Sequence, residues 1–169
     1  MQQAVKLNID EAFSPSSNVG AWRFIIRDED GGVALAGAGN MGQAYDALMV
    51  EATACLKALE LADQYDIFRI ELELADSKQL EEAIRTPSRN LGPSGMIFKA
   101  IRQLLFLRFN FLSLKHVPRL CNSSAHEAAQ LARVWDPGRV HVWMDDLPTR
   151  VSVAVAHDLV ELSLINIRP

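Results

Sequence analysis

Three acidic residues, Asp10, Glu51 and Asp76, have positions along the chain that suit metal-ion chemistry. Asp10 and Asp76 each end a stretch of alternating apolar and polar residues, whereas Glu51 lies inside the apolar stripe of a predicted helix. In a mixed sheet, the ends of neighbouring strands and a helix that crosses them can meet at one point. Carboxylates that converge there repel one another unless divalent cations lie between them. A pair of such ions can promote in-line displacement at phosphorus.

The helix predicted over residues 43–66 is amphipathic, and Glu51 interrupts its apolar stripe. The apolar residues recur three or four positions apart: Ala44, Ala47, Leu48, Ala52, Cys55, Leu59 and Ala62. Glu51 follows Leu48 by three positions and precedes Cys55 by four, so it faces the predicted core. A carboxylate there needs a charged or hydrogen-bonding partner. Glu51 is either a structural residue, in a salt bridge or at a frayed helix edge, or a metal-binding or catalytic carboxylate.

The elements that must position these acids show both strand and helix patterns. Alternation, or for residues 19–27 a richness in aromatic and β-branched residues, predicts strands at residues 5–10, 19–27, 33–38, 67–75 and 109–117. Short turns join the first three strands, which we therefore expect to run antiparallel. After the long helix, further helices are predicted at residues 78–85, 95–108, 123–135 and 151–162. The sequence thus predicts an α/β protein with a mixed sheet.

Composition limits the class of protein. Of the 169 residues, 49% are hydrophobic, which is enough for the core of one domain. The formal net charge of −4 at pH 7 argues against a protein that binds nucleic acid by charge alone. Cys55 and Cys121 are too few for a disulfide framework, and no signal segment or membrane span is recognisable. We expect an intracellular protein, nuclear or cytoplasmic, that does not bind membranes.

A glycine motif offers a competing interpretation. Residues 37–42 form a Gly-x-Gly-x-x-Gly pattern between a predicted strand and the long helix, and Asp76 ends the next strand, as in a dinucleotide fingerprint. However, the strand before the motif belongs to an antiparallel meander, and one further strand is too few for a doubly wound sheet. A dinucleotide-binding site would also not explain why the carboxylate of Glu51 faces the predicted core. A glycine-rich turn is the favoured explanation of the motif, and a dinucleotide-binding protein remains the less favoured alternative.

Short segments along nearly the whole chain resemble ribonuclease H, in the same order. They are Lys6-Leu7-Asn8-Ile9-Asp10, Gly20-Ala21-Trp22, Ile26-Arg27-Asp28, Val50-Glu51-Ala52, Ala75-Asp76-Ser77 and Val117-Pro118-Arg119-Leu120-Cys121-Asn122-Ser123-Ser124-Ala125-His126. The last segment is similar to the plant branch of the type 1 family, a reverse-transcriptase-associated domain of plant retroelements. The resemblance implies a five-stranded mixed sheet, strands 1–3 antiparallel, with helices on both faces. Residues 1–136 would form the ribonuclease H-like domain, and residues 137–169 a C-terminal tail packing on it.

The same resemblance implies an activity and a set of site residues. The family cleaves the RNA strand of RNA–DNA hybrids with two Mg²⁺ or Mn²⁺ ions, and a monomer is expected. Carried over by position, the catalytic and metal-binding residues are Asp10, Glu51, Asp76 and His126. His126 stands where bacterial and animal enzymes have an Asp, and neutral imidazole can ligate a divalent metal. Without the resemblance, His126 would be assigned to a solvent-facing helix start.

Departures from the family pattern fall on the substrate side of the expected site. Glu11 replaces a glycine that lets the backbone approach RNA closely, Arg23 replaces a second glycine, and Leu48 replaces a polar hybrid contact. The expected substrate-binding residues are Glu11, Ser77, Arg119 and Asn122. These departures keep open an alternative function, a catalytically weak binding or interaction module derived from a retroelement.

Overall fold

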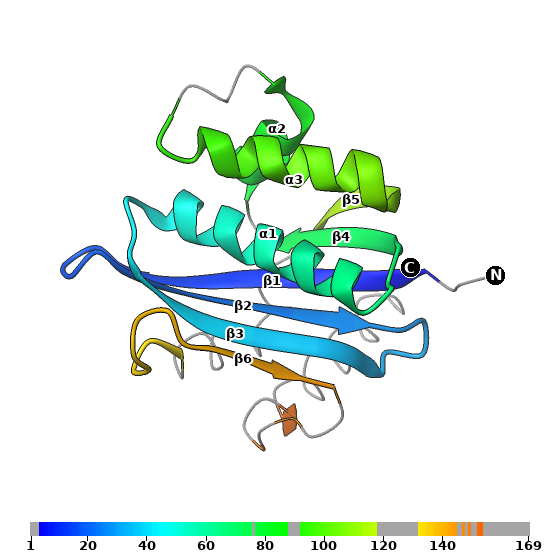
Figure 1. The fold of residues 1–169 in the computed structure, drawn as a ribbon, viewed down its shortest axis with the longest axis horizontal. Helices are drawn as coiled ribbons and strands as arrows, with labels where there is room; N and C mark the ends of the chain where they lie inside the picture. The colour runs from blue at the N-terminus through cyan, green and yellow to red at the C-terminus, as the bar shows by residue number, and fades with distance from the viewer. Residues whose placement is uncertain are drawn as a thin grey trace, which may run out of the picture.

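The structure is a computed structural model that describes residues 4–75, 77–87, 92–117, 132–144, 147, 149 and 152–153. The strands in this part of the chain are β1 (Val5–Ser14), β2 (Val19–Arg27), β3 (Val33–Gln43), β4 (Arg69–Ala75), β5 (Asn110–Val117) and β6 (Val140–Trp143). The helices are α1 (Ala47–Gln64), α2 (Lys78–Arg85) and α3 (Gly95–Arg108). Figure 1 shows α1 and α3 drawn across the front of one continuous sheet.

The described strands form one mixed sheet in the order β5-β4-β1-β2-β3-β6. β1, β2 and β3 pair antiparallel, as predicted, whereas β4 pairs parallel with both β1 and β5. The predicted α/β fold with a mixed sheet is confirmed. The expected five strands were one too few, because β6 pairs antiparallel with the outer edge of β3. Four residues are too short a segment to show a strand pattern in the sequence.

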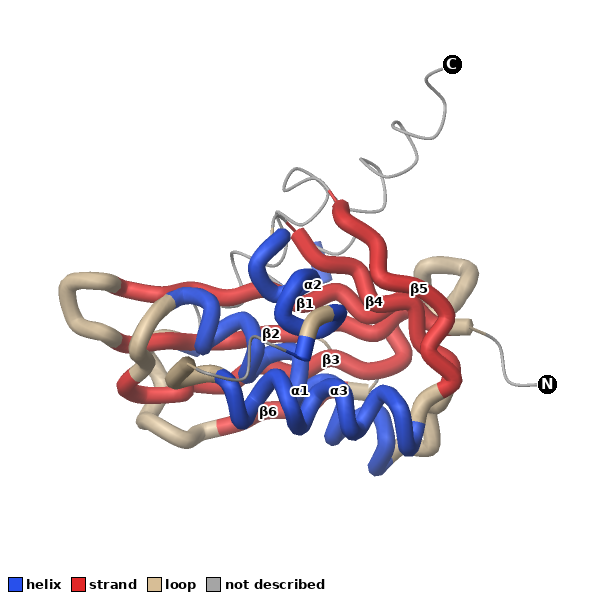
Figure 2. The backbone as a smooth tube through the Cα atoms, turned by 90° about the horizontal axis from the view of Figure 1, so that it is seen from above, coloured by secondary structure: helices blue, strands red, loops and turns tan. Residues whose placement is uncertain are grey.

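Two strands continue further than their sequence patterns predicted. β1 does not end at Asp10 but pairs with β2 as far as Ser14, opposite Val19. β3 continues to Gln43, so that the helix begins later than residue 43. Asp46 caps α1, because its Oδ1 accepts a hydrogen bond of 2.8 Å from the backbone N–H of Met49. The long antiparallel arms of β1, β2 and β3 extend well beyond β4 and β5 (Figure 2).

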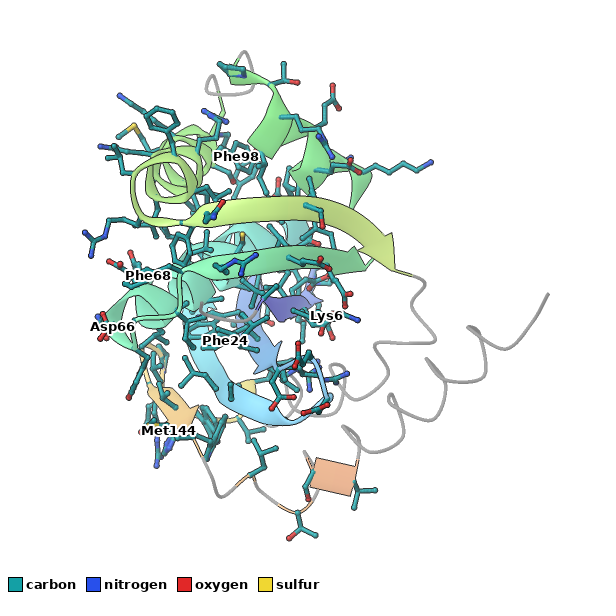
Figure 3. The ribbon with its side chains drawn as sticks, turned by 90° about the vertical axis from the view of Figure 1, so that its right-hand side faces the viewer. Lys6, Phe24, Asp66, Phe68, Phe98 and Met144 are labelled. Carbon is teal, nitrogen blue, oxygen red and sulfur yellow. The ribbon has the colours of Figure 1, made fainter. Side chains whose placement is uncertain are left out.

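The main core lies between the sheet and the helices. Leu7, Ile9, Phe24 and the inner face of α1 belong to this apolar cluster, which continues to Phe98 on α3. Phe24 is fully buried and Phe98 is nearly fully buried. Both side chains are labelled in Figure 3. A smaller cluster lies on the opposite face of the sheet and contains Ala12, Ala21, Ala38 and Ala132, with Trp135 and Trp143 packed against it. Most of the helix predicted at 123–135 lies outside the described residues.

The glycine motif has a packing role inside β3. A Cβ atom added to Gly37 would lie 2.5 Å from Cε1 of Phe24, and one added to Gly39 would lie 2.5 Å from Cζ2 of Trp22. The two glycines therefore leave room for aromatic rings that lie across the sheet. Gly42 adopts a positive φ of 73° at the end of the strand. Because the motif lies within an antiparallel strand, it lacks the strand–loop–helix geometry of a dinucleotide fingerprint.

Candidate functional site

Asp10 lies where β1 loses its pairing with β4. The last residue pair of the parallel ladder is Ile9 with Leu74, and β4 ends at Ala75, the residue before Asp76 in the sequence. From Asp10 onwards β1 remains paired with β2. The side chain of Asp10 is half-buried. It is therefore fixed on a rigid strand while it keeps access to solvent, which a metal-binding or catalytic carboxylate requires.

Alternation along β1 places Asp10 on the sheet face opposite α1. Ile9 packs in the core beneath α1, whereas Ala12 packs in the smaller cluster on the other face. Successive residues of a strand point to opposite faces, so Asp10 shares the face of Ala12, and Glu11 shares the face of Ile9 and α1. Glu11 is half-buried and lies opposite Trp22. The carboxylates of Asp10 and Glu11 thus project from opposite faces of the sheet.

Glu51 lies in the N-terminal half of α1, between the fully buried residues Val50 and Ala52. Its own side chain is half-buried. The pKa of the Cys55 thiol is raised far above its usual value, first by burial and then by the negative charge of Glu51. Glu51 is thus close enough to the buried Cys55, one helical turn later, to raise the pKa of its thiol. This proximity is consistent with the predicted position of Glu51 on the inner side of the helix.

Close packing fixes α1 over the far half of β1 and β2. Gly20, which pairs with Phe13 of β1, lies directly beneath Val50, and a Cβ at Gly20 would collide with the Val50 side chain. Figures 1 and 2 show β1 and β2 continuing past the end of β4. The N-terminal half of α1 crosses this part of the sheet (Figure 1). Glu51 therefore approaches β1 on the side of the molecule where β4 no longer covers its edge.

A buried hydrogen bond joins β1 to β4 next to this edge. Asn8 donates through Nδ2 to Oε2 of Glu73, with 2.7 Å between the two atoms, and the two residues are 8% and 7% exposed. Asn8 lies two residues before Asp10 and on the same face. Sequence reasoning missed this pair, although a signal was present: Asn8 and Glu73 are polar residues within two strands whose next neighbours are apolar.

Arg23 is the other residue near Asp10 that sequence reasoning did not place. It is the direct partner of Asp10 in the β1–β2 ladder and is 3% exposed. The sequence showed an arginine in place of a family glycine, but only the register shows which residue lies opposite it. A buried guanidinium is a permanent positive charge next to the candidate site.

Ser77 is the N-cap of α2. Its Oγ accepts a hydrogen bond of 3.1 Å from the backbone N–H of Leu80. The hydroxyl proton is still available to a phosphate oxygen, so capping is compatible with the predicted role in substrate binding. The other predicted site residues, Asp76, Arg119, Asn122 and His126, lie outside the described residues.

Within the described residues, no group of three or more His, Cys, Asp or Glu side chains is arranged to hold a metal ion. Asp10 and Glu51 are the predicted ligands in this part of the chain, and both offer carboxylate oxygens, the donors that Mg²⁺ and Mn²⁺ prefer. The chemistry of this donor pair fits divalent metal ions. In the same part of the chain, no helix combines the length and apolar character needed to cross a membrane.

The family is shown by a model described as reverse transcriptase-like, which matches residues 8–132. The chain belongs to this family. Among solved structures, it is similar to RNase H1 from the halophilic archaeon Halobacterium salinarum NRC-1, with 26% identity, a TM-score of 0.64, and coverage of 76% of this chain and 96% of that one. Among curated proteins, no match was found.

Two further structures share the fold at lower identity. LC11-RNase H1, isolated from compost and solved in complex with an RNA/DNA hybrid, is 20% identical with a TM-score of 0.67, over 76% of this chain and 96% of that one. The N-terminal RNase H domain of rv2228c from Mycobacterium tuberculosis is 18% identical with a TM-score of 0.68, over 78% and 94%. The protein therefore contains a ribonuclease H-like domain.

Proposed function

We propose that this protein is a metal-dependent endonuclease that cleaves the RNA strand of RNA–DNA hybrids. The observation that carries the proposal is the position of Asp10, half-buried on β1 one residue beyond the last β1–β4 pair, where β4 no longer covers the edge of the strand. The proposal is supported by the shared fold with LC11-RNase H1, which was solved with an RNA/DNA hybrid.

We assign the ions and the catalysis to four residues: Asp10, Glu51, Asp76 and His126. Three carboxylates and one imidazole suit two Mg²⁺ or Mn²⁺ ions, with the imidazole favouring Mn²⁺. When bound, the ions would supply Lewis-acid stabilisation of charge on the phosphate and lower the pKa of the attacking water. The contribution of the protein is to hold its ligands on rigid elements, Asp10 on β1 and Glu51 on a helix packed against Gly20.

We assign substrate contacts to Glu11, Ser77, Arg119 and Asn122. Ser77, as the cap of α2, can donate its hydroxyl proton to a backbone phosphate while its oxygen accepts from Leu80. Arg119 would contribute the positive charge that neutralises a phosphate, and Asn122 hydrogen bonds to sugar or base edges. Glu11 would weaken rather than strengthen binding, because its negative charge lies on the strand that carries Asp10.

The direct test is a cleavage assay with an end-labelled RNA–DNA hybrid and added Mg²⁺ or Mn²⁺. The expected result is cleavage of the RNA strand alone, which is abolished by chelation and by Asp10→Asn or Glu51→Gln. Double-stranded DNA and single-stranded RNA of the same sequence are the substrate controls. If Asp10→Asn cleaves the hybrid as fast as the wild-type protein, the assignment of nuclease activity to this site is wrong.

A second candidate function is a hybrid-binding module with little catalysis. It is favoured by the two charged residues that flank Asp10 where the family has glycines, Glu11 next to it on β1 and Arg23 opposite it on β2. The assay above separates the two candidates when it is combined with hybrid binding by filter retention. Binding that persists without cleavage at saturating metal would favour the module.

We further propose that the chain derives from a plant retroelement and acts as a monomer. The C-terminal segment 137–169 would belong to the same domain as residues 1–136, a view supported by the pairing of β6 with β3. Sedimentation of the full chain tests the monomer. Limited proteolysis tests the domain division, because a tail packed on the domain should resist cleavage near residue 137.

A further inference from the structure

Asp10 and Arg23 face each other across the β1–β2 ladder. The pairs on either side, Ile9 with Phe24 and Glu11 with Trp22, project toward α1, so Asp10 and Arg23 project together from the opposite face. Directly opposed residues of antiparallel strands have Cβ atoms about 4.5–5.5 Å apart. Neither side chain is without a partner. The backbone alone therefore places the guanidinium and the carboxylate within reach of each other.

Burial makes a counter-ion for Arg23 necessary. Arg23 is 3% exposed, and its surroundings on this face include Ala12, Ala21 and Ala38, which are buried and apolar. A guanidinium does not lose its proton at any ordinary pH, so it cannot avoid the cost of desolvation by becoming neutral. A buried charge of this kind is stable only when an opposite charge and hydrogen bonds meet it.

Among the described strands, the register identifies Asp10 as the acidic residue nearest to Arg23 on this face. In the fully described strands β1, β2 and β3, alternation places one carboxylate on the Arg23 face, that of Asp10. Glu73 lies on the same face but on β4, two strands from β2, a separation of about 10 Å at the usual strand spacing. Glu73 also accepts the hydrogen bond of Asn8. Among the described strands, Asp10 is therefore the partner that lies within reach of Arg23.

We propose that Arg23 is a built-in counter-ion of Asp10 and competes with divalent metal ions for its carboxylate. This inference rests on the proposed function, which assigns Asp10 to the ion site. A metal ion that binds Asp10 must share the carboxylate with a cation already present or displace it. Arg23 therefore sets the metal concentration that the site requires and stabilises the metal-free protein.

The first experiment measures Mn²⁺ binding to the nucleic-acid-free protein, by the electron paramagnetic resonance signal of free Mn²⁺. Arg23→Met keeps much of the side-chain volume but removes the charge, and should tighten Mn²⁺ binding on the order of tenfold. Arg23→Lys keeps the charge and should bind like wild type. Arg27→Met is the matched control, because Arg27 is equally buried (4% exposed) and on the same face of β2 but lies opposite Lys6.

The same variants give a second measurement, thermal unfolding without metal. Asp10→Asn should lower Tm by about 5 °C, because it leaves the Arg23 charge buried without its counter-ion. Adding Arg23→Met to Asp10→Asn should recover part of that loss, and should bring no gain in Mn²⁺ affinity over Asp10→Asn alone. Should Arg23→Met fail to fold, Arg23→Gln takes its place in both measurements.

The outcomes separate this inference from the proposed function. If Arg23→Met and Arg23→Gln bind Mn²⁺ like wild type, or Asp10→Asn raises Tm, Arg23 is not the counter-ion of Asp10, whether or not the protein cleaves hybrids. If Arg23→Met tightens Mn²⁺ binding and Arg27→Met does not, the counter-ion is supported. Absence of hybrid cleavage in every variant would then count against the nuclease proposal alone.

Discussion

Asn8 and Glu73 form a buried hydrogen bond that joins β1 to β4 two residues before Asp10, with 2.7 Å between Nδ2 and Oε2. The pair fixes the register of the two central parallel strands where the candidate site begins. Since both residues are almost inaccessible to solvent, water cannot replace either partner at low cost.

Removal of the donor should therefore be costly. Asn8→Ala leaves the buried Glu73 carboxyl group without its hydrogen bond and should lower the free energy of unfolding by about 2 kcal/mol. Glu73→Gln should cost less, because the glutamine side-chain oxygen can still accept from Asn8. Urea unfolding measures both. Equal losses for the two variants would contradict the assigned roles of donor and acceptor.

Gly20 should tolerate no larger residue while Val50 lies above it. Gly20→Ala forces Val50 and the N-terminal half of α1 away from the sheet and should cost about 1–3 kcal/mol in urea unfolding. Gly92→Ala is the matched control, since no atom lies within 4 Å of the added Cβ, and should change stability by less than about 0.5 kcal/mol. Adding Val50→Ala to Gly20→Ala should recover part of the loss. If it does not, the two side chains are not in conflict.

Cys55 should give the protein a specific loss of stability at alkaline pH. Burial, and then the charge of Glu51, raise the pKa of the folded thiol, so the unfolded chain releases its proton first as pH rises past about 8.5. From that pH upward the unfolded state binds fewer protons, and the free energy of unfolding should fall by up to about 1.4 kcal/mol per pH unit from this group.

Urea unfolding between neutral pH and about pH 10 measures this slope, and Cys55→Ala is the comparison. The difference in stability between wild type and Cys55→Ala should be constant up to about pH 8.5 and shrink above it. A difference that stays constant over the whole range would show that the thiol titrates equally in both states.

Glu11 should oppose hybrid binding, because it places a negative charge on the strand that carries Asp10. Glu11→Gln removes the charge, and Glu11→Gly additionally allows closer approach of the backbone. We expect hybrid affinity to rise from wild type to Glu11→Gln to Glu11→Gly in filter binding at low salt. Asp30→Asn, in the exposed turn between β2 and β3, controls for net charge. A rise of the same size in Asp30→Asn would assign the effect to overall charge.

Local patterns in the sequence predicted most of the elements but not how far they extend. Aromatic and β-branched residues located β2, alternation located β4, and the apolar stripe located α1 with Glu51 on its inner side. β1 was cut short at Asp10, because Glu11 stands where the alternation of Val5, Leu7 and Ile9 calls for an apolar residue. That half of the strand is held by its pairing with β2, which is a contact between segments rather than a property of one segment.

The candidate site was predictable in its residue types but not in its pairings. Asp10 and Glu51 stood out because acids next to apolar runs are unusual. Arg23 did not stand out, because the sequence does not show which residue lies opposite an arginine in an apolar strand. Only the strand register places Asp10 there. The pairs Asn8–Glu73 and Gly20–Val50 likewise join residues far apart in the chain.

The short strand β6 also has a consequence for how the protein avoids self-association. β3 is the longest strand described, and β6 covers its outer edge from Ala36 to Gly39. Without β6, that stretch would present unpaired backbone donors and acceptors on a glycine-containing strand edge, which readily pairs with a strand from another molecule. A chain truncated at residue 136 would retain every predicted site residue and yet be prone to aggregate through the β3 edge.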